Sequence, residues 1–132
     1  MRIGSTFPAH TSASAKAILA FQASDDQVAS LFLDKDLRKL TKNTIIDLAT
    51  FKAQLLQVKE LGYAVEEEEV ETGVSCVAAP VLLNGKTAVA ALSVPGPTGR
   101  ILMPSAERLG RIVSQHARSL SVELDATVAR KK

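Results

Sequence analysis

The chain has 132 residues, of which 46% are hydrophobic, and its 16 basic and 14 acidic residues give a net charge of +2 at neutral pH. This length and composition predict one globular domain. Aromatic residues make up only 4%, which argues against a base-stacking nucleic-acid platform, and the near-neutral charge gives no electrostatic footprint for binding a phosphate backbone.

The single cysteine, Cys76, excludes an intramolecular disulfide and a cysteine-rich zinc site. A reducing, cytoplasmic setting is therefore expected. No apolar run approaches the roughly 20 residues that a membrane span needs. The first ten residues also lack the basic region and long apolar core of a signal peptide. We expect a soluble cytoplasmic domain that has no membrane contact, no metal and no cofactor.

Capping residues predict three helices in the first half of the chain. Ser12 and Ser24 can each cap a helix by accepting backbone hydrogen bonds, as can Asp47. Gly62 supplies the left-handed residue that commonly ends a helix. A polar loop is predicted from Lys35 to Asn43. In the third helix, four apolar residues recur at helical spacing: Phe51, Leu55, Val58 and Leu61.

Three antiparallel strands are predicted after Gly62. Residues 63–70 carry few apolar side chains and suit a sheet edge, whereas residues 74–83 are nearly all apolar and suit a central strand. The dipeptide Asn84-Gly85 predicts a two-residue hairpin turn, because both positions of that turn need a positive φ. Residues 88–94 are then expected to return as another buried strand.

A long helix is predicted from about Pro104 or Ser105. A histidine, His116, falls on its predicted buried face, where a lone histidine is more often a core or edge residue than a ligand. Helices followed by an antiparallel sheet and a final helix predict the α+β class, although three strands form a thin sheet for this amount of helix. The buried stripe of the last helix is expected to contain Leu109, Ile112, Val113, Leu120 and Leu124.

Cys76 allows three interpretations. A catalytic thiol needs a nearby base or positive charge to lower its pKa, and the only histidines, His10 and His116, are far away in sequence. The thiol could instead line a ligand pocket, or it could be an ordinary buried residue that behaves as a small hydrophobe.

The acidic run from Glu66 to Glu69 alternates between the two faces of its predicted strand, so at most two carboxylates would converge. Two carboxylates are too few to hold a hard cation. The run is therefore expected to be a solvated edge that discourages strand addition. A member turned inward would be costly and would indicate a function.

Small residues open the first helix and suggest a second candidate site. Free amides at Ala13 and Ser14 could bind an anion, although the same pattern fits an ordinary helix cap. Lys16, farther along this helix, is expected to point to solvent. Ser93 faces opposite to its apolar neighbours in the last strand, which suits the floor of a pocket.

Three stretches in order resemble the effector-binding domain of IclR-type bacterial transcriptional regulators: residues 8–17 (PAHTSASAKA), residues 62–81 (GYAV, the acidic run and GVSCVAAPV) and residues 90–97 (AALSVPGP). The resemblance covers almost the whole chain. It implies a GAF-like or profilin-like antiparallel sheet flanked by helices, with residues 1–132 forming a partial domain that lacks its N-terminal helix and first strands.

The resemblance also implies a function without enzymatic activity. The domain would bind a small-molecule effector such as an organic acid, would reach DNA only through an upstream domain absent from this chain, and would assemble as a homodimer or homotetramer. Two positions depart from the family: Glu66 stands where Asp is usual, and Pro95 where a second serine is common. The implied effector-binding residues are Ala13, Ser14, Glu66, Cys76 and Ser93. The alternative is a thiol-based redox sensor or enzyme centred on Cys76.

Overall fold

The computed structural model describes residues 3–22, 24–33 and 37–131, and it confirms the predicted α+β class. The first part of the predicted loop from Lys35 to Asn43 lies outside the described residues. The elements in chain order are η1 (Ala9–Thr11), α1 (Ala13–Gln22), α2 (Asp25–Ser30), α3 (Leu48–Leu61), β1 (Ala64–Glu67), β2 (Val74–Leu83), β3 (Thr87–Pro97), α4 (Thr98–Leu102) and α5 (Ala106–Arg130).

The predicted caps begin the first three α-helices, and the predicted glycine ends the third. Ser12, Ser24 and Asp47 each accept a hydrogen bond from the backbone amide three residues farther on. At α2 the bond belongs to a complete capping box. Gly62 ends α3 with a φ of 84°, a conformation that glycine adopts without steric cost.

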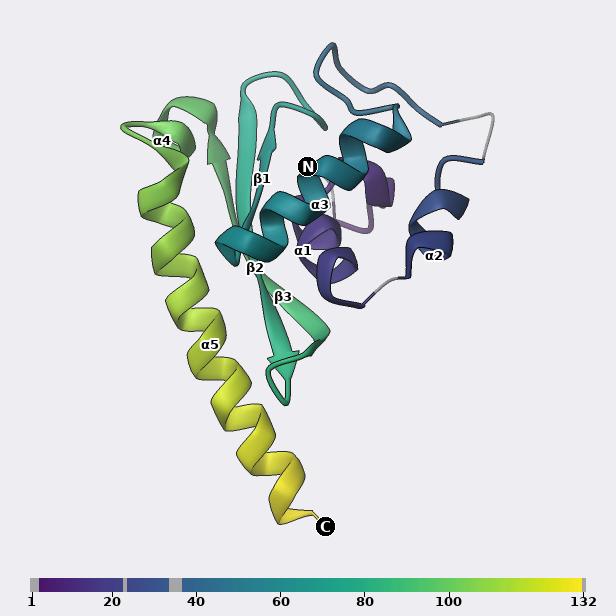
Figure 1. The fold of residues 1–132 in the computed structure, drawn as a ribbon. Helices are drawn as coiled ribbons and strands as arrows, with labels where there is room; N and C mark the ends of the chain where they lie inside the picture. Colours follow the sequence, from purple (N-terminus) through teal and green to yellow (C-terminus); the bar gives the residue numbers. More distant parts are fainter. Residues whose placement is uncertain (1–2, 23, 34–36, 132) are drawn as a thin grey trace.

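The three strands form one antiparallel sheet in the order β1-β2-β3 (Figure 1). Helix α1 packs on one face of this sheet with α3 beside it, and α5 packs across β2 on the other face. The chain is therefore arranged in three layers, with the sheet in the middle. The predicted hairpin is confirmed, since Asn84 and Gly85 both have positive φ, at 54° and 67°.

Two predictions about the outer strands are wrong. The last strand was expected to be buried, but β3 lies at the sheet edge and is largely exposed, with Val89 at 49% and Val94 at 37%. The first strand was expected to reach residue 70, but it ends at Glu67 because Glu68 has a φ of 54°, which turns the chain out of the extended conformation.

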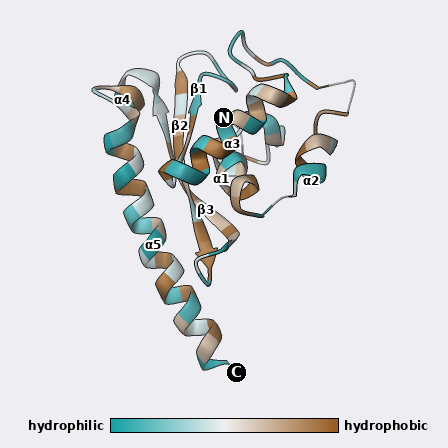
Figure 2. Ribbon diagram, in the orientation of Figure 1, coloured by the Kyte–Doolittle hydropathy of each residue, from teal (hydrophilic) through white to brown (hydrophobic). Residues whose placement is uncertain are grey.

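Each face of the sheet has its own core, and the hydropathy colours of Figure 2 show apolar segments along β2 and β3. On the α5 face, Tyr63, Val77 and Val113 belong to one cluster of buried residues. On the α1 face, Ala17 and Ala78 belong to another, whose small side chains let α1 approach the sheet closely. A third cluster, around Val28, Ile45, Phe51 and Leu55, joins α2 to α3.

The predicted buried stripe of α5 is only partly correct. Val113 is buried, but Ile112 and Leu120 are each 44% exposed, and His116 between them is exposed too. Leu109 and Leu124 are partly buried and pack against the core on the α5 face, as predicted. Small residues on the same face bring the helix close to the sheet: Gly110, Ser114 and Ala117 are buried there together with Val113.

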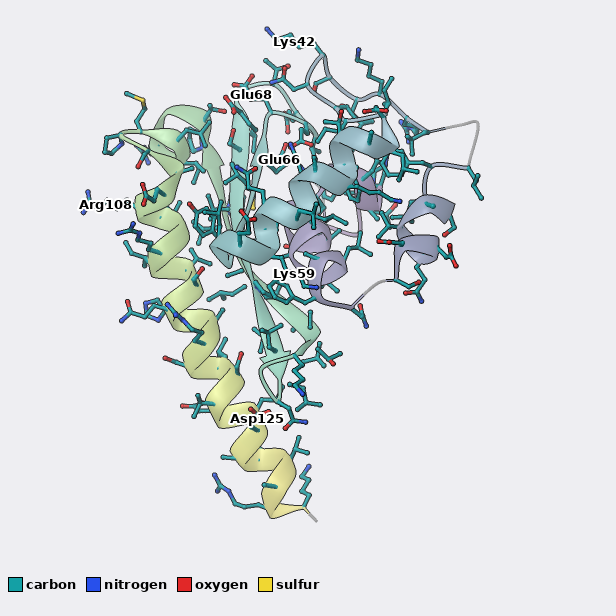
Figure 3. All side chains as sticks on the ribbon, in the orientation of Figure 1. Lys42, Lys59, Glu66, Glu68, Arg108 and Asp125 are labelled. Carbon is teal, nitrogen blue, oxygen red and sulfur yellow. The ribbon has the colours of Figure 1, made fainter. Side chains whose placement is uncertain are left out.

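The C-terminal half of α5 is joined to the β2–β3 hairpin by two side chains. A register shift between Val81 and Leu82 interrupts the strand pairing. The Leu82 amide donates a hydrogen bond to Ser121 Oγ (2.9 Å), and the Asn84 amide donates one to Asp125 Oδ1 (2.8 Å). Figure 3 labels Asp125 on α5, beside the tip of the hairpin. These bonds connect the helix to the tip of the hairpin. Within the described part of the chain, no helix is both long enough and apolar enough to cross a membrane.

Candidate functional site

A cavity of about 320 Å³ lies where the N-terminus of α1 meets the sheet. Its volume is near the lower end of the range of roughly 300–1,000 Å³ that small-molecule sites occupy. Apolar side chains, among them Phe7, Val70 and Val74, supply much of its wall. All five residues that the sequence resemblance implied line this one cavity: Ala13, Ser14, Glu66, Cys76 and Ser93.

The strand register explains why residues from three strands converge. Glu66 of β1 pairs with Cys76 of β2, which pairs in turn with Pro95 of β3. Residues directly opposite each other in a sheet point to the same face. Ser93 lies two residues from Pro95 on that face, which is the face covered by α1. The prediction that Ser93 faces a pocket is consistent with this arrangement.

The first turn of α1 closes the opposite side of the cavity with backbone donors. The first four amides of a helix lack intrahelical acceptors. Ser12 accepts two hydrogen bonds here, from the Ala15 amide to its side chain (3.3 Å) and from the Lys16 amide to its carbonyl oxygen (3.0 Å). The Ala13 and Ser14 amides are the two remaining donors of this turn, and such donors bind carboxylates and phosphates.

Glu66 supplies the acidic wall of the cavity. Its side chain is buried, and Oε1 accepts hydrogen bonds from the Glu69 amide and from the Val70 amide (3.0 Å). Among the described residues 3–22, 24–33 and 37–131, none donates a hydrogen bond to Oε2, so this oxygen can accept one from a ligand. Burial raises the pKa of the Glu66 carboxyl, and the two backbone hydrogen bonds partly oppose that change.

The expectation that the acidic run is a solvated edge is wrong for two of its four members. Glu66 and Glu69 are only 3% and 4% exposed, whereas Glu67 is exposed and Glu68 half-buried. The positive φ of Glu68 breaks the strand alternation, so residues 66 and 69 both turn inward. A carboxylate in the interior needs a compensating partner, and the structure provides one.

That partner is Lys16, which was predicted to point to solvent and is instead fully buried. Its Nζ lies 2.8 Å from Oε1 and 2.7 Å from Oε2 of Glu69. Burial lowers the pKa of Lys16 and raises that of Glu69. The sequence contained a signal that we missed: Lys16 follows Ala13 by three residues and precedes Ala20 by four, so it lies on the apolar face of α1.

The environment of Cys76 does not activate a thiol. Burial, and secondarily the charge of Glu66, raise the pKa of Cys76 to about 11, so the thiol is protonated at neutral pH. Neither histidine lines this cavity: His10 Nε2 lies 2.9 Å from the Arg38 carbonyl oxygen, and His116 is exposed on α5. Cys76 lines the cavity as a neutral group.

Comparison with known proteins gives consistent matches over most of the chain. The family model described as bacterial transcriptional regulator IclR C-terminal matches residues 1–122. The HTH-type transcriptional repressor AllR of Escherichia coli K12 is 33% identical over 122 residues, which cover 92% of this chain and 45% of AllR. The chain thus spans less than half the length of the curated relatives it matches.

Two solved structures extend the comparison to three dimensions. The transcriptional regulator YaiJ superposes with a TM-score of 0.87 at 32% identity, over 96% of this chain and 71% of that chain. A double mutant of the inducer-binding domain of PobR from Acinetobacter, solved with 3-hydroxybenzoic acid, superposes with a TM-score of 0.70 at 29% identity, over 89% and 69% of the two chains.

Proposed function

We propose that this chain, which belongs to the bacterial transcriptional regulator IclR C-terminal family, binds a small organic acid or a related metabolite and thereby modulates transcription. The chain is an effector-binding domain of this family, and its relatives described above are transcriptional regulators. In this proposal a DNA-binding domain elsewhere in the full-length protein reads the operator. The protein acts in the cytoplasm as a homodimer or homotetramer.

The observation that carries the proposal is the polarity of the cavity. Its two ends offer opposite hydrogen-bonding groups, donors at the Ala13 and Ser14 amides and an acceptor at Glu66. A ligand with a carboxylate at one end and a hydroxyl or amide donor at the other satisfies both ends. Apolar side chains such as those of Phe7, Val70 and Val74 supply much of the remaining wall and suit the apolar part of such a ligand.

Two residues shape the cavity and favour particular ligands. Glu66 extends one methylene farther than the aspartate usual in similar proteins, and Pro95 supplies no hydroxyl or backbone donor. Both changes disfavour the smallest polar carboxylates and favour a partly apolar acid. The PobR domain solved with 3-hydroxybenzoic acid supports an acid that also carries a hydroxyl.

A thermal-shift screen tests the proposal. The panel pairs each acid with its uncharged amide, for example 3-hydroxybenzoate with 3-hydroxybenzamide and pyruvate with pyruvamide. An acid that binds stabilises the fold by about 2.7 kcal/mol at a concentration of 100 times its Kd. We expect at least one acid to raise the melting temperature while its amide does not.

Variants of two serines locate the site. Ser14→Trp places an indole in the cavity, so the response to the acid should disappear. Ser119→Trp makes the same change on the exposed surface of α5 and should respond like the parent. If an acid shifts the melting temperature of both variants equally, the binding site is not this cavity. If acids and their amides shift the melting temperature of the parent equally, the α1 amides do not recognise the carboxylate.

The alternative function, a thiol-based redox sensor or enzyme centred on Cys76, has less support. It needs a thiolate near neutral pH, whereas burial keeps the Cys76 thiol protonated. Alkylation of Cys76 at pH 7 at the rate of a free thiol or above would support this alternative function.

A further inference from the structure

Glu69 uses every one of its polar groups within the fold. Its amide donates to Glu66 Oε1, and its carbonyl oxygen accepts from Thr44 Oγ1 (2.7 Å). Its carboxylate accepts from Lys16 Nζ at both oxygens, and Oε2 also accepts from the Glu67 amide (3.3 Å). Glu69 therefore connects three separate segments: α1, the loop before α3 and the turn between β1 and β2.

The two ends of the cavity are linked through this residue. Lys16 follows Ala13 by one turn of α1, so its ammonium group is held at a fixed distance from the donor amides. The Glu69 carboxylate accepts hydrogen bonds from that ammonium group, and the Glu69 amide donates one to the Glu66 carboxylate. The positive φ of Glu68 lets one residue face both partners.

The loop before α3 fixes the same turn from outside. Thr41 Oγ1 donates to the Glu68 carbonyl oxygen, and Asn43 Nδ2 donates to that of Glu67 (3.1 Å). The turn therefore has little freedom while the Lys16–Glu69 pair is intact. A buried ion pair is often no more stabilising than apolar residues of the same volume, so stability alone gives little reason to place one here.

We infer that the buried Lys16–Glu69 ion pair is a positioning device that sets the distance between the α1 amides and the Glu66 carboxylate, and so selects the length of the ligand. The part concerning ligand length rests on the proposed function. The part concerning Glu66 does not, and it can be tested without a ligand. Lys16 and Glu69 act through Glu66 and need not touch the ligand themselves.

Cys76 can report the position of Glu66, because the two residues pair in the sheet register. Burial is the main cause of the raised pKa of the thiol, and the charge of Glu66 raises it further. The probe is iodoacetamide, and the measurement is its rate of reaction with Cys76 at pH 8. Glu66→Gln removes the charge, so we expect the pKa of the thiol to fall and alkylation to be several-fold faster than in the parent.

The decisive comparison is a double-mutant cycle. The pair Lys16→Met and Glu69→Gln, made together, leaves the local net charge unchanged and the buried volume similar. If the pair holds Glu66, this variant should react several-fold faster than the parent, about three-fold or more, and should add nothing in the Glu66→Gln background. Glu67→Gln, the same change at an exposed position of the same run, should leave the rate unchanged.

A merely structural role would give a different result. General loosening would accelerate alkylation by the same factor whether residue 66 is Glu or Gln, and that outcome overturns the inference, as does an unchanged rate. Thermal unfolding confirms that each variant is folded. If the paired variant does not fold, Thr44→Val weakens the hold on the Glu69 carbonyl oxygen without touching a buried charge, and the same cycle applies.

Binding of 3-hydroxybenzoate and pyruvate to the same variants separates the two proposals. If every acid fails to bind the parent while the alkylation cycle shows coupling, the organic-acid function falls and the positioning role of the pair stands. If an acid binds the parent, the paired variant should bind it at least about ten-fold more weakly. Unchanged affinity would overturn the selection of ligand length.

Discussion

Replacing Lys16 by methionine should destabilise the fold by about 3–5 kcal/mol at pH 7, because removal of one partner of a buried ion pair leaves the other charge uncompensated. Lys16 is fully buried, and methionine fills most of the same volume, so the loss comes from Glu69 rather than from packing. Domains of this size are stable by only about 5–15 kcal/mol, so the change is large.

The pH dependence of this loss has a definite sign. Burial raises the pKa of Glu69 in the folded state above its unfolded value of about 4.3. A carboxyl group with a raised folded pKa adds stability below its unfolded pKa, and that stability is lost as the pH rises through the folded pKa. The Lys16 ammonium group lowers this pKa in the parent, so its removal raises the pKa of Glu69 farther. The deficit of the Lys16→Met variant should therefore shrink as the pH falls from 7 towards 4.5.

Urea unfolding followed by circular dichroism measures both effects. The combined Lys16→Met and Glu69→Gln variant should recover to within about 2 kcal/mol of the parent, because no buried charge remains. Lys59→Met, the same change at an exposed position of α3, should stay within about 0.5 kcal/mol. The reasoning would be refuted if the unfolding free energy of Lys16→Met alone lay within about 1 kcal/mol of the parent at pH 7, or if the deficit grew as the pH falls.

Three further predictions concern single positions. At pH 7, Cys76 should react with iodoacetamide about 100-fold more slowly than a cysteine whose pKa is the ordinary 9.0, because its pKa is about 11; a rate within about five-fold of a free thiol would contradict the buried environment. Gly110→Ala should lower stability by about 1 kcal/mol, because the new Cβ would lie 2.6 Å from ring atoms of Tyr63 and the overpacking cost of roughly 1–3 kcal/mol exceeds the gain in helix propensity. The matched Gly99→Ala meets nothing within 4 Å and should not lower stability, as thermal unfolding of both variants would show. Ser24→Ala removes the capping box of α2 and should cost about 1 kcal/mol in the same assay; no change in melting temperature would mean that α2 does not contribute to the cooperative fold.

Features that depend on a few adjacent residues could be predicted from the sequence. The caps at Ser24 and Asp47, the helix end at Gly62 and the hairpin at Asn84-Gly85 all reflect local backbone chemistry that holds in any fold. The five residues around the cavity were identified in a different way. The order of three motifs implied them, and composition or periodicity alone would not have brought them together.

Features that depend on which other element packs against a helix or strand could not be predicted from the local sequence. Helix α5 carries two sets of apolar residues, and the spacing of Ile112 and Leu120 is as helical as that of the face that packs on the sheet. The choice between them depends on close approach to the sheet, which only small residues such as Ala117 permit. Likewise, nothing in the acidic run indicates that Glu68 leaves the strand and turns Glu69 inward.

The two hydrogen bonds from α5 to the hairpin make the amide hydrogen exchange of the hairpin depend on a distant part of the chain. The amides of Leu82 and Asn84 are protected by Ser121 and Asp125, which belong to another element, rather than by a neighbouring strand. Their exchange with deuterium therefore requires the end of α5 to separate from the hairpin, whether or not β2 and β3 remain paired. Protection at these two amides thus reports the docking of the last helix, about forty residues farther along the chain.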